Sequence, residues 1–450
     1  AFAGAVALAL LVSGGALRGA DAVPGERWCG VPDGDGIARE VDRIEFAGNR
    51  VTRPEVLERE LVQRRGEICS LDDIIDGIQS LMDLGLFRSV RAELSLERRA
   101  FAVGGDFTGE VLVLRYIVRE KLFFLAIPRF SRTADGELRT GLQLRWDNFS
   151  GRLHELRLTV ERRQEDDGRG HDGYVRSLEY RVPRFFGTPW GAEVELGVES
   201  RRTTLSRESE TFGEGRREST RVVFGMARWL GRSLGVQGWR ARAGIGLERR
   251  EIELTEGERG PIADGLDASV VVGVEKLAVN EDSYRRRGHR FGASVRVAGD
   301  WTGSDFAYHR MDLRYLRYRP LDGGIRNLNL QARLGFSDGA PFGIEAYDIG
   351  GGELLRGVAP GRDVGDVLAV VNIEYLAAFF TRPEWRRVLF VDIGNVYPRE
   401  RIRPLALNLR LGVGLRYKLR ALTRTDLRLD VGWDPDEGRP VTFFATSLAF

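Results

Sequence analysis

The sequence predicts a mainly β protein, in which a C-terminal antiparallel transmembrane β-barrel of sixteen strands follows one small α+β domain. Three observations predict this fold. Segments after residue 121 alternate apolar and polar residues without a convincing helix, 56 glycines stand against 15 prolines, and no run of 18 apolar residues occurs. Strands with one apolar face suit a barrel whose other face lines a wet lumen. Helical membrane spans are excluded by the short apolar runs, whereas a barrel is not.

Composition narrows the class further. The 450 residues include 68 Lys and Arg and 66 Asp and Glu, which gives a net charge of +2. This balance provides no basic footprint for nucleic acid, so no nucleic-acid partner is expected. The 42% of hydrophobic residues excludes a disordered chain.

The first residues have the pattern of an export signal. An apolar stretch is followed by small residues and by Ala20-Asp-Ala22, an A-x-A-like cleavage site, which predicts a signal peptide over residues 1–22. The alternative is a buried N-terminal helix. Export would place the lead segment, residues 23–39, in an oxidising compartment. Cys29 and Cys69 could pair there and tie this segment to the first domain, or they could be unrelated thiols.

The next residues predict the order strand, helix, helix, strand, strand. Val41–Phe46 alternates as a strand, and Thr52 can cap a first helix. Ser70 can cap a second helix, with acidic residues at its positive end. Phe87–Leu96 and Val111–Arg119 are the last two strands.

Three features of residues 40–120 resemble a POTRA domain, the periplasmic module of outer-membrane assembly factors. They are Ile44-Glu-Phe-Ala-Gly-Asn49, Gly66 between the helices, and Leu84-Gly-Leu-Phe-Arg-Ser-Val90 at the start of a strand. The alternative is any other small α+β domain. The resemblance implies that the domain binds unfolded chains by offering a sheet edge to an extra strand.

Residues 121–450 contain the barrel segments. His289–Val297 and Asp426–Trp433 alternate most clearly, with arginines on the polar face. Short periplasmic turns and two longer opposite loops, Thr203–Ser219 and Asp338–Gly365, fit an outer-membrane barrel. The sixteen segments begin near Leu122, Gly136, Leu153, Gly173, Trp190, Thr220, Val236, Gly265, His289, Asp305, Ile325, Asp366, Arg387, Leu407, Arg424 and Val441.

Barrel closure requires the first strand, Leu122–Arg132, to pair with the last, Val441–Phe450. Pro128 lacks an N–H and interrupts that ladder, which predicts a weak seam. On the last strand, Phe444, Leu448 and the terminal Phe450 belong to the seam.

Three late segments, taken together, resemble the BamA/TamA-like outer-membrane assembly superfamily, also called the bacterial surface antigen family. Leu355-Arg-Gly357 is similar to the family's loop tip, and Val371–Tyr375 is similar to its twelfth strand. Phe390-Val-Asp-Ile-Gly394 matches the F-x-D-x-G pattern of the thirteenth strand. The resemblance covers residues 40–450 and implies a loop, residues 339–365, that folds into the barrel.

The physical interpretation of these residues agrees with the resemblance. Arg356 can be held by Glu374 and Asp392 on neighbouring strands through charge-assisted hydrogen bonds. Gly357 would let the loop backbone approach the wall, and Gly394 would leave space beside Asp392. Phe390 lies on the same polar face by period-two counting. The alternative is an ordinary lumen ion pair in a generic barrel.

No enzymatic site is predicted, so no catalytic residue, metal or cofactor is assigned. Gly231-Arg-Ser-Leu-Gly235 matches G-x-S-x-G, but it joins two barrel strands rather than a strand and a helix. An arginine between Glu374 and Asp392 explains this carboxylate pair better than a glycosidase site does. The histidines are scattered and lack metal-ligand spacing. They are His154, His171, His289 and His309.

These inferences predict an outer-membrane insertion or translocation factor with its POTRA domain in the periplasm. It would act through strand capture by that domain and through the weak seam. The expected partners are outer-membrane lipid, unfolded β-barrel or secreted client proteins, and periplasmic accessory proteins. The alternatives are a two-partner-secretion-type transporter and a passive pore.

Overall fold

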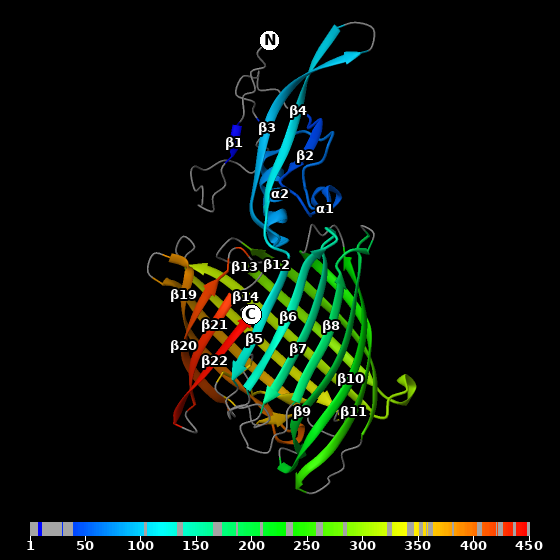
Figure 1. Cartoon of the computed structure of the whole chain (residues 1–450), viewed down its shortest axis with the longest axis vertical. Coiled ribbons are helices and arrows are strands. Elements are labelled where there is room, and N and C mark those ends of the chain that lie inside the picture. The colour runs from blue at the N-terminus through cyan, green and yellow to red at the C-terminus, as the bar shows by residue number, and fades with distance from the viewer. Residues whose placement is uncertain are drawn as a thin grey trace.

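The computed structural model has two parts, a small α+β domain and a large β-sheet curved into a barrel (Figure 1). Neither described helix is long and apolar enough to cross a membrane. The structure describes residues 8–10, 29, 39–102, 106–132, 138–164, 173–185, 188–207, 210–230, 237–257, 264–281, 286–321, 326–339, 346–350, 354–356, 358, 363–379, 382–402, 407–419, 421, 426–434 and 438–447.

The small domain has the predicted α+β order, with a mixed sheet arranged β1-β3-β4-β2. β2 pairs in parallel with β4, while β3 and β4 form a long antiparallel hairpin. Leu57, Leu81 and Tyr116 are fully buried in its core. The elements are β1 (Leu8–Leu10), β2 (Arg43–Ala47), α1 (Pro54–Arg59), α2 (Leu71–Asp83), β3 (Phe87–Ala102) and β4 (Asp106–Glu120).

Local chemistry explains the helix starts, with one correction. Ser70 caps α2 as predicted, because its Oγ accepts a hydrogen bond from the Asp73 N–H at 3.3 Å. Thr52 does not cap α1, and the prediction was wrong. The N-cap of α1 is Arg53, and the Thr52 hydroxyl instead donates to Glu120 Oε1 at 2.6 Å.

Most of the predicted signal peptide (1–22) and lead segment (23–39) lies outside the described residues. Within it, Leu8–Leu10 form β1 and pair antiparallel with the outer edge of β3. These three residues are therefore extended, and the buried N-terminal helix considered as the alternative does not include them.

The sixteen predicted barrel strands are confirmed as one antiparallel sheet. They are β5 (Phe124–Arg132), β6 (Leu138–Phe149), β7 (His154–Gln164), β8 (Gly173–Val182), β9 (Trp190–Arg207), β10 (Glu210–Leu230), β11 (Gly238–Gly257), β12 (Gly265–Glu281), β13 (Arg286–Ala298), β14 (Tyr308–Leu321), β15 (Arg326–Asp338), β18 (Val367–Phe379), β19 (Arg382–Tyr397), β20 (Asn408–Lys418), β21 (Asp426–Asp434) and β22 (Arg439–Ser447).

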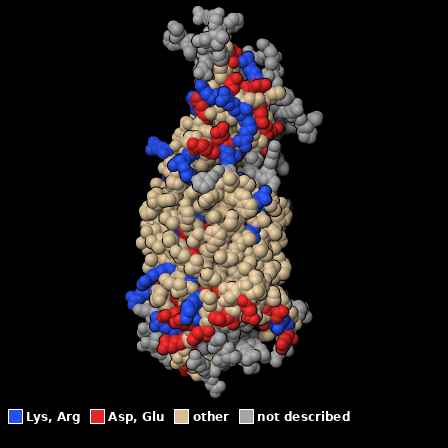
Figure 2. Space-filling model, turned by 90° about the vertical axis from the view of Figure 1, so that its right-hand side faces the viewer, with Lys and Arg blue, Asp and Glu red and all other residues tan. Residues whose placement is uncertain are grey.

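The prediction of a long loop at Thr203–Ser219 was wrong. β9 continues to Arg207 and β10 begins at Glu210, and the two strands pair through this segment with one irregularity between Thr211 and Gly213. Main-chain hydrogen bonds do not need apolar side chains, so the ladder extends past the point where the apolar alternation stops. Figure 2 shows a band of the barrel wall with few charged residues, between two zones rich in both charge signs.

The barrel seam also differs from the prediction. β5 and β22 are the two ends of the hydrogen-bonded sheet, and no ladder joins them in the described part of the chain. They nevertheless lie next to each other (Figure 1). The predicted pairing of first and last strands is therefore replaced by contact without a ladder.

The small domain sits against the turn between β6 and β7. The Arg53 N–H donates to Gly151 O at 3.1 Å, and Asn148 Nδ2 donates to Thr52 Oγ1 at 2.9 Å. Leu153 is buried within the core cluster of the small domain. Asn148, Ser150 and Leu153 have φ values of 59°, 56° and 65°, which non-glycine residues seldom adopt. The turn is thus held in a strained shape by the domain it contacts.

Candidate functional site

The candidate site is formed where the β15–β18 connection folds against the barrel wall. A short pairing of β16 (Tyr347–Asp348) with β17 (Val364–Gly365) shapes this connection. Ile349, Leu355 and Val358 are buried in one apolar cluster with residues of β18 and β19. Apolar burial on both sides of residue 356 fixes the loop backbone, so the Arg356 side chain has a defined direction.

Arg356 lies between two carboxylates, as the sequence pattern predicts. Its Nε and Nη2 donate to Asp392 at 2.6 and 2.5 Å, and its Nη1 donates to Glu374 Oε1 at 2.6 Å. The Arg356 main-chain N–H also donates to Asp392 Oδ2 at 3.2 Å. The side chains of Arg356, Glu374 and Asp392 are 2%, 0% and 0% exposed. These short, charge-assisted bonds lie in a place from which water is nearly excluded.

Phe390 also contacts the Arg356 side chain. The Arg356 guanidinium carbon lies 3.6 Å from the centre of the Phe390 ring, a cation–π geometry. Gly412 opposes Phe390 on β20, and a methyl group at position 412 would overlap the ring. Gly432 on β21 leaves room for the Arg356 carbonyl oxygen in the same way. Two glycines on inward strand faces thus make space for the loop tip.

Sequence reasoning missed the second half of this cluster. Asp430 on β21 lies 3.5 Å from Arg356 Nη1 and also accepts from Arg416 Nη1 at 2.5 Å and from Arg428 Nε at 2.5 Å. Arg416 Nη2 donates to Glu374 Oε1 at 3.1 Å. Three arginines and three carboxylates are therefore linked in one network. In the sequence, the only indication that these residues could join the site was the alternation that placed Arg428 and Asp430 on the polar face of their strand.

Asn372 is a further missed member. Its Nδ2 donates to Leu354 O at 2.6 Å and to Asp392 Oδ1 at 2.9 Å, and so joins the loop to the wall. We call Arg356, Asn372, Glu374, Asp392, Arg416, Arg428 and Asp430 the loop-tip cluster.

Of the two predicted glycines, only Gly394 can be compared with the prediction, and it differs from it. Gly357 lies outside the described residues. Gly394 does not mainly leave space beside Asp392, because a methyl group there would approach Ala369 O at 2.5 Å and Val370 Cγ2 at 2.8 Å. Gly394 instead permits close contact between the backbones of β18 and β19.

The seam is a second candidate site, and main-chain geometry shows which way Pro128 faces. Asp147 N–H donates to Phe123 O at 2.8 Å, and Pro128 lies opposite Leu142 in the same register. Bonded and non-bonded residues alternate along an antiparallel pair. Pro128 is therefore in a position that faces away from β6, toward β22, and its missing N–H falls on the seam. Phe444 lies on β22 opposite Leu429, and Leu448 and Phe450 lie outside the described residues.

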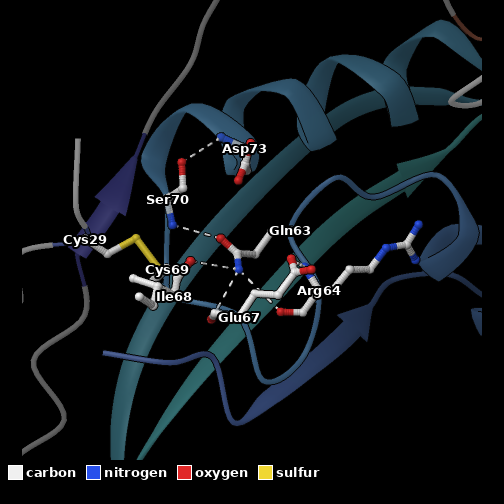
Figure 3. The surroundings of a disulfide bond; sticks show 8 residues. All are labelled: Cys29, Gln63, Arg64, Glu67, Ile68, Cys69, Ser70 and Asp73. Atoms are coloured by element: carbon white, nitrogen blue, oxygen red, sulfur yellow. Dashed lines mark hydrogen bonds between the residues drawn. A yellow bond between two sulfur atoms is a disulfide. The ribbon is translucent and has the colours of Figure 1, made fainter. Parts of the chain in front are cut away.

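Cys29 and Cys69 are joined by a disulfide (Figure 3). Cys69 directly precedes Ser70, the cap of α2, and Gln63 accepts a hydrogen bond from the Ser70 N–H at 2.8 Å. Gln63 also donates to Ile68 O at 3.2 Å. The disulfide therefore attaches the lead segment at a hydrogen-bonded point of the small domain.

Comparison with known proteins identifies both parts. A model of the Omp85 superfamily domain matches residues 148–443, and a POTRA model, described as surface antigen variable number repeat, matches residues 40–120. No curated protein sequence matches the chain.

Two solved structures have a similar fold. CdiB from Acinetobacter baumannii aligns with a TM-score of 0.60 at 17% identity, over 92% of this chain and 74% of that chain. BamA from Haemophilus ducreyi, in a form lacking POTRA domains 1–3, aligns with a TM-score of 0.54 at 16% identity, over 91% of this chain and 84% of that chain.

Proposed function

The chain belongs to the Omp85 superfamily, and on that basis we propose that it inserts β-barrel proteins into the outer membrane through its seam. The resemblance stated from the sequence motifs is confirmed, including a POTRA domain at residues 40–120. Membership supports a general role in outer-membrane insertion or translocation, with the barrel in the outer membrane, the POTRA domain in the periplasm, and protein clients as partners. Superfamily members act as insertion or transport factors rather than enzymes.

The observation that carries the proposal is the unpaired contact between β5 and β22. Two strand edges that touch without a ladder offer main-chain donors and acceptors to an incoming strand. Pro128, facing this edge, removes one donor and disfavours direct closure. A client strand would add to the edge through main-chain hydrogen bonds, which tolerate many sequences.

The POTRA domain would supply clients by capturing extended segments. The outer edge of β3 supports this step, because Leu8–Leu10, which belong to the predicted signal peptide, pair there as an added antiparallel strand. The hydrogen bonds at Asn148 and Arg53 keep that domain beside the first strands of the barrel.

The loop-tip cluster would keep the inward loop in place and anchor the strands beside the seam. Asp430 lies on β21, the neighbour of β22, and is bonded to Arg416 and Arg428. The cluster thereby connects the loop to the C-terminal side of the seam.

A reversible lock tests the seam mechanism. Paired cysteines, one at Ala126 on β5 and one among positions 441–447 on β22, would be oxidised in protein reconstituted into liposomes. We expect faster insertion of an unfolded barrel client with wild type, no acceleration with the oxidised pair, and recovery after reduction. The reduced protein is the matched control.

Full activity of the oxidised form would contradict the seam mechanism. If wild type does not accelerate insertion but conducts ions, a passive pore fits better. If it exports only a secreted partner protein, a two-partner-secretion-type transporter fits better.

A further inference from the structure

A second polar region lies in the lumen, apart from the loop-tip cluster. It is a cavity of about 650 Å³ between the inward faces of β8 to β15. Nine arginines and five carboxylates line this cavity, and two of the arginines, Arg181 and Arg221, are also ion-paired with Glu155 and Glu195 outside the lining. The excess of guanidinium groups indicates a place where negative charge is favoured.

The carboxylates that line the cavity are distributed unevenly among its arginines. Glu275 on β12 accepts a hydrogen bond from Arg240 at 2.6 Å, and it also lies 3.5 Å from Arg242 and from Arg290. Asp312 is occupied by Arg310 of its own strand, at 3.1 Å. One carboxylate cannot neutralise three guanidinium groups, so positive charge remains in the cavity wall.

The excess is greatest on β13, β14 and β15. Arg296 lies directly opposite Arg310, and Arg314 lies directly opposite Arg333, all on inward positions that line the cavity. Like charges directly opposite each other destabilise a sheet. Within the described ranges, neither Arg296 nor Arg333 has a carboxylate in ion-pair distance or a side-chain hydrogen-bond partner.

We propose that Arg314 and Arg333, which lie opposite each other on β14 and β15 with Arg296 on the same inward face, bind small inorganic oxyanions of the phosphate class. Arg310 is not part of this site, because its guanidinium already donates to Asp312 and to Ala346 O. Opposed residues on one sheet face have Cβ atoms only about 5 Å apart, so both guanidinium groups of a pair can contact one tetrahedral anion. The planar guanidinium matches an oxyanion with two parallel N–H donors. The bound anion would replace the repulsion between Arg314 and Arg333 by attraction to both.

The test is titration of the purified full-length protein with inorganic phosphate at constant ionic strength, followed by calorimetry. We expect saturable binding to wild type and an affinity at least about tenfold lower in R296Q/R333Q, since each loses charge-assisted bonds to the anion. The matched control is R176Q/R249Q, which removes two exposed, outward-facing arginines that do not line this cavity. Its phosphate affinity should equal that of wild type.

A second measurement distinguishes loss of the site from loss of the fold. In phosphate-free buffer, R296Q/R333Q should unfold at a temperature equal to or above that of wild type, because the opposed like charges are relieved. Phosphate should raise the unfolding temperature of wild type but not that of the variant. Absence of saturable binding to wild type, or equal affinities of wild type and R296Q/R333Q, would overturn the proposal.

Discussion

Replacement of Arg356 by methionine should release the inward loop, because the change leaves buried carboxylates without their partner. Asp392 loses most: two side-chain hydrogen bonds from Arg356 disappear, and the Asn372 amide and one main-chain N–H remain. Glu374 would still accept a hydrogen bond from Arg416, and Asp430 would still accept hydrogen bonds from Arg416 and Arg428. Breaking a fully buried ion pair on one side costs about 3–5 kcal/mol. The loop should therefore open roughly 150- to 5,000-fold more often.

The opening can be measured by thiol labelling. Val358 is buried beside the loop tip, so a cysteine there reacts only when the loop opens, and Cys29 and Cys69 do not compete because they are joined. We expect V358C/R356M to react faster than V358C by the factor given above. The labelling rate of V358C/R356M/D392N should lie between those of V358C and V358C/R356M, since the second change removes the carboxylate that has lost its partner.

The matched control is Arg221→Met on β10. Arg221 also contacts a glutamate, Glu195, but the two side chains are 43% and 32% exposed, and such a pair contributes about 0–1 kcal/mol. Labelling of V358C/R221M should stay close to that of V358C. If V358C/R356M reacts no faster than V358C/R221M, the loop does not depend on the arginine and the reasoning fails.

Three further predictions concern the POTRA domain and its contact with the barrel. Leu153→Ala removes a barrel side chain from the POTRA core and should weaken the docking of the POTRA domain on the barrel by about 2–5 kcal/mol. The weaker docking should appear as faster hydrogen exchange at the interface, and unchanged exchange would contradict the prediction. Cys69→Ala opens a link across 40 residues and should lower POTRA stability by about 4 kcal/mol in urea, whereas a loss under 1 kcal/mol would show that the link is not structural. Burial, with neighbouring Asp73 and Asp72, raises the pKa of the Asp76 carboxyl above its ordinary value. A carboxyl whose pKa is higher in the folded state stabilises the domain below the unfolded pKa, and this stability is lost as the pH rises through the folded pKa. Asp76→Asn should therefore raise the free energy of unfolding at pH 7 but not at pH 3. An equal increase at both pH values would contradict the predicted direction of the pKa shift.

The sequence predicted the strands well where one face meets lipid and the other meets water. Alternation located segments such as His289–Val297 and Asp426–Trp433 because lipid requires apolar side chains on one face only. The prediction failed at Thr203–Ser219, where the strands continue beyond the lipid and both faces can be polar. It also failed at Thr52, whose hydroxyl bonds to Glu120 and Asn148, both distant in sequence.

The sequence by itself determined the class of fold, the number of strands, and the face on which each lumen residue lies, because a period of two follows from strand geometry alone. It also brought Arg356, Glu374 and Asp392 together through motif resemblance. Only the tertiary structure decided that Arg416, Arg428 and Asp430 share this cluster, and that Arg296 and Arg310 face each other. Register and loop docking set the depth and neighbours of a side chain, and these depend on hydrogen bonds between strands rather than on the pattern within one strand.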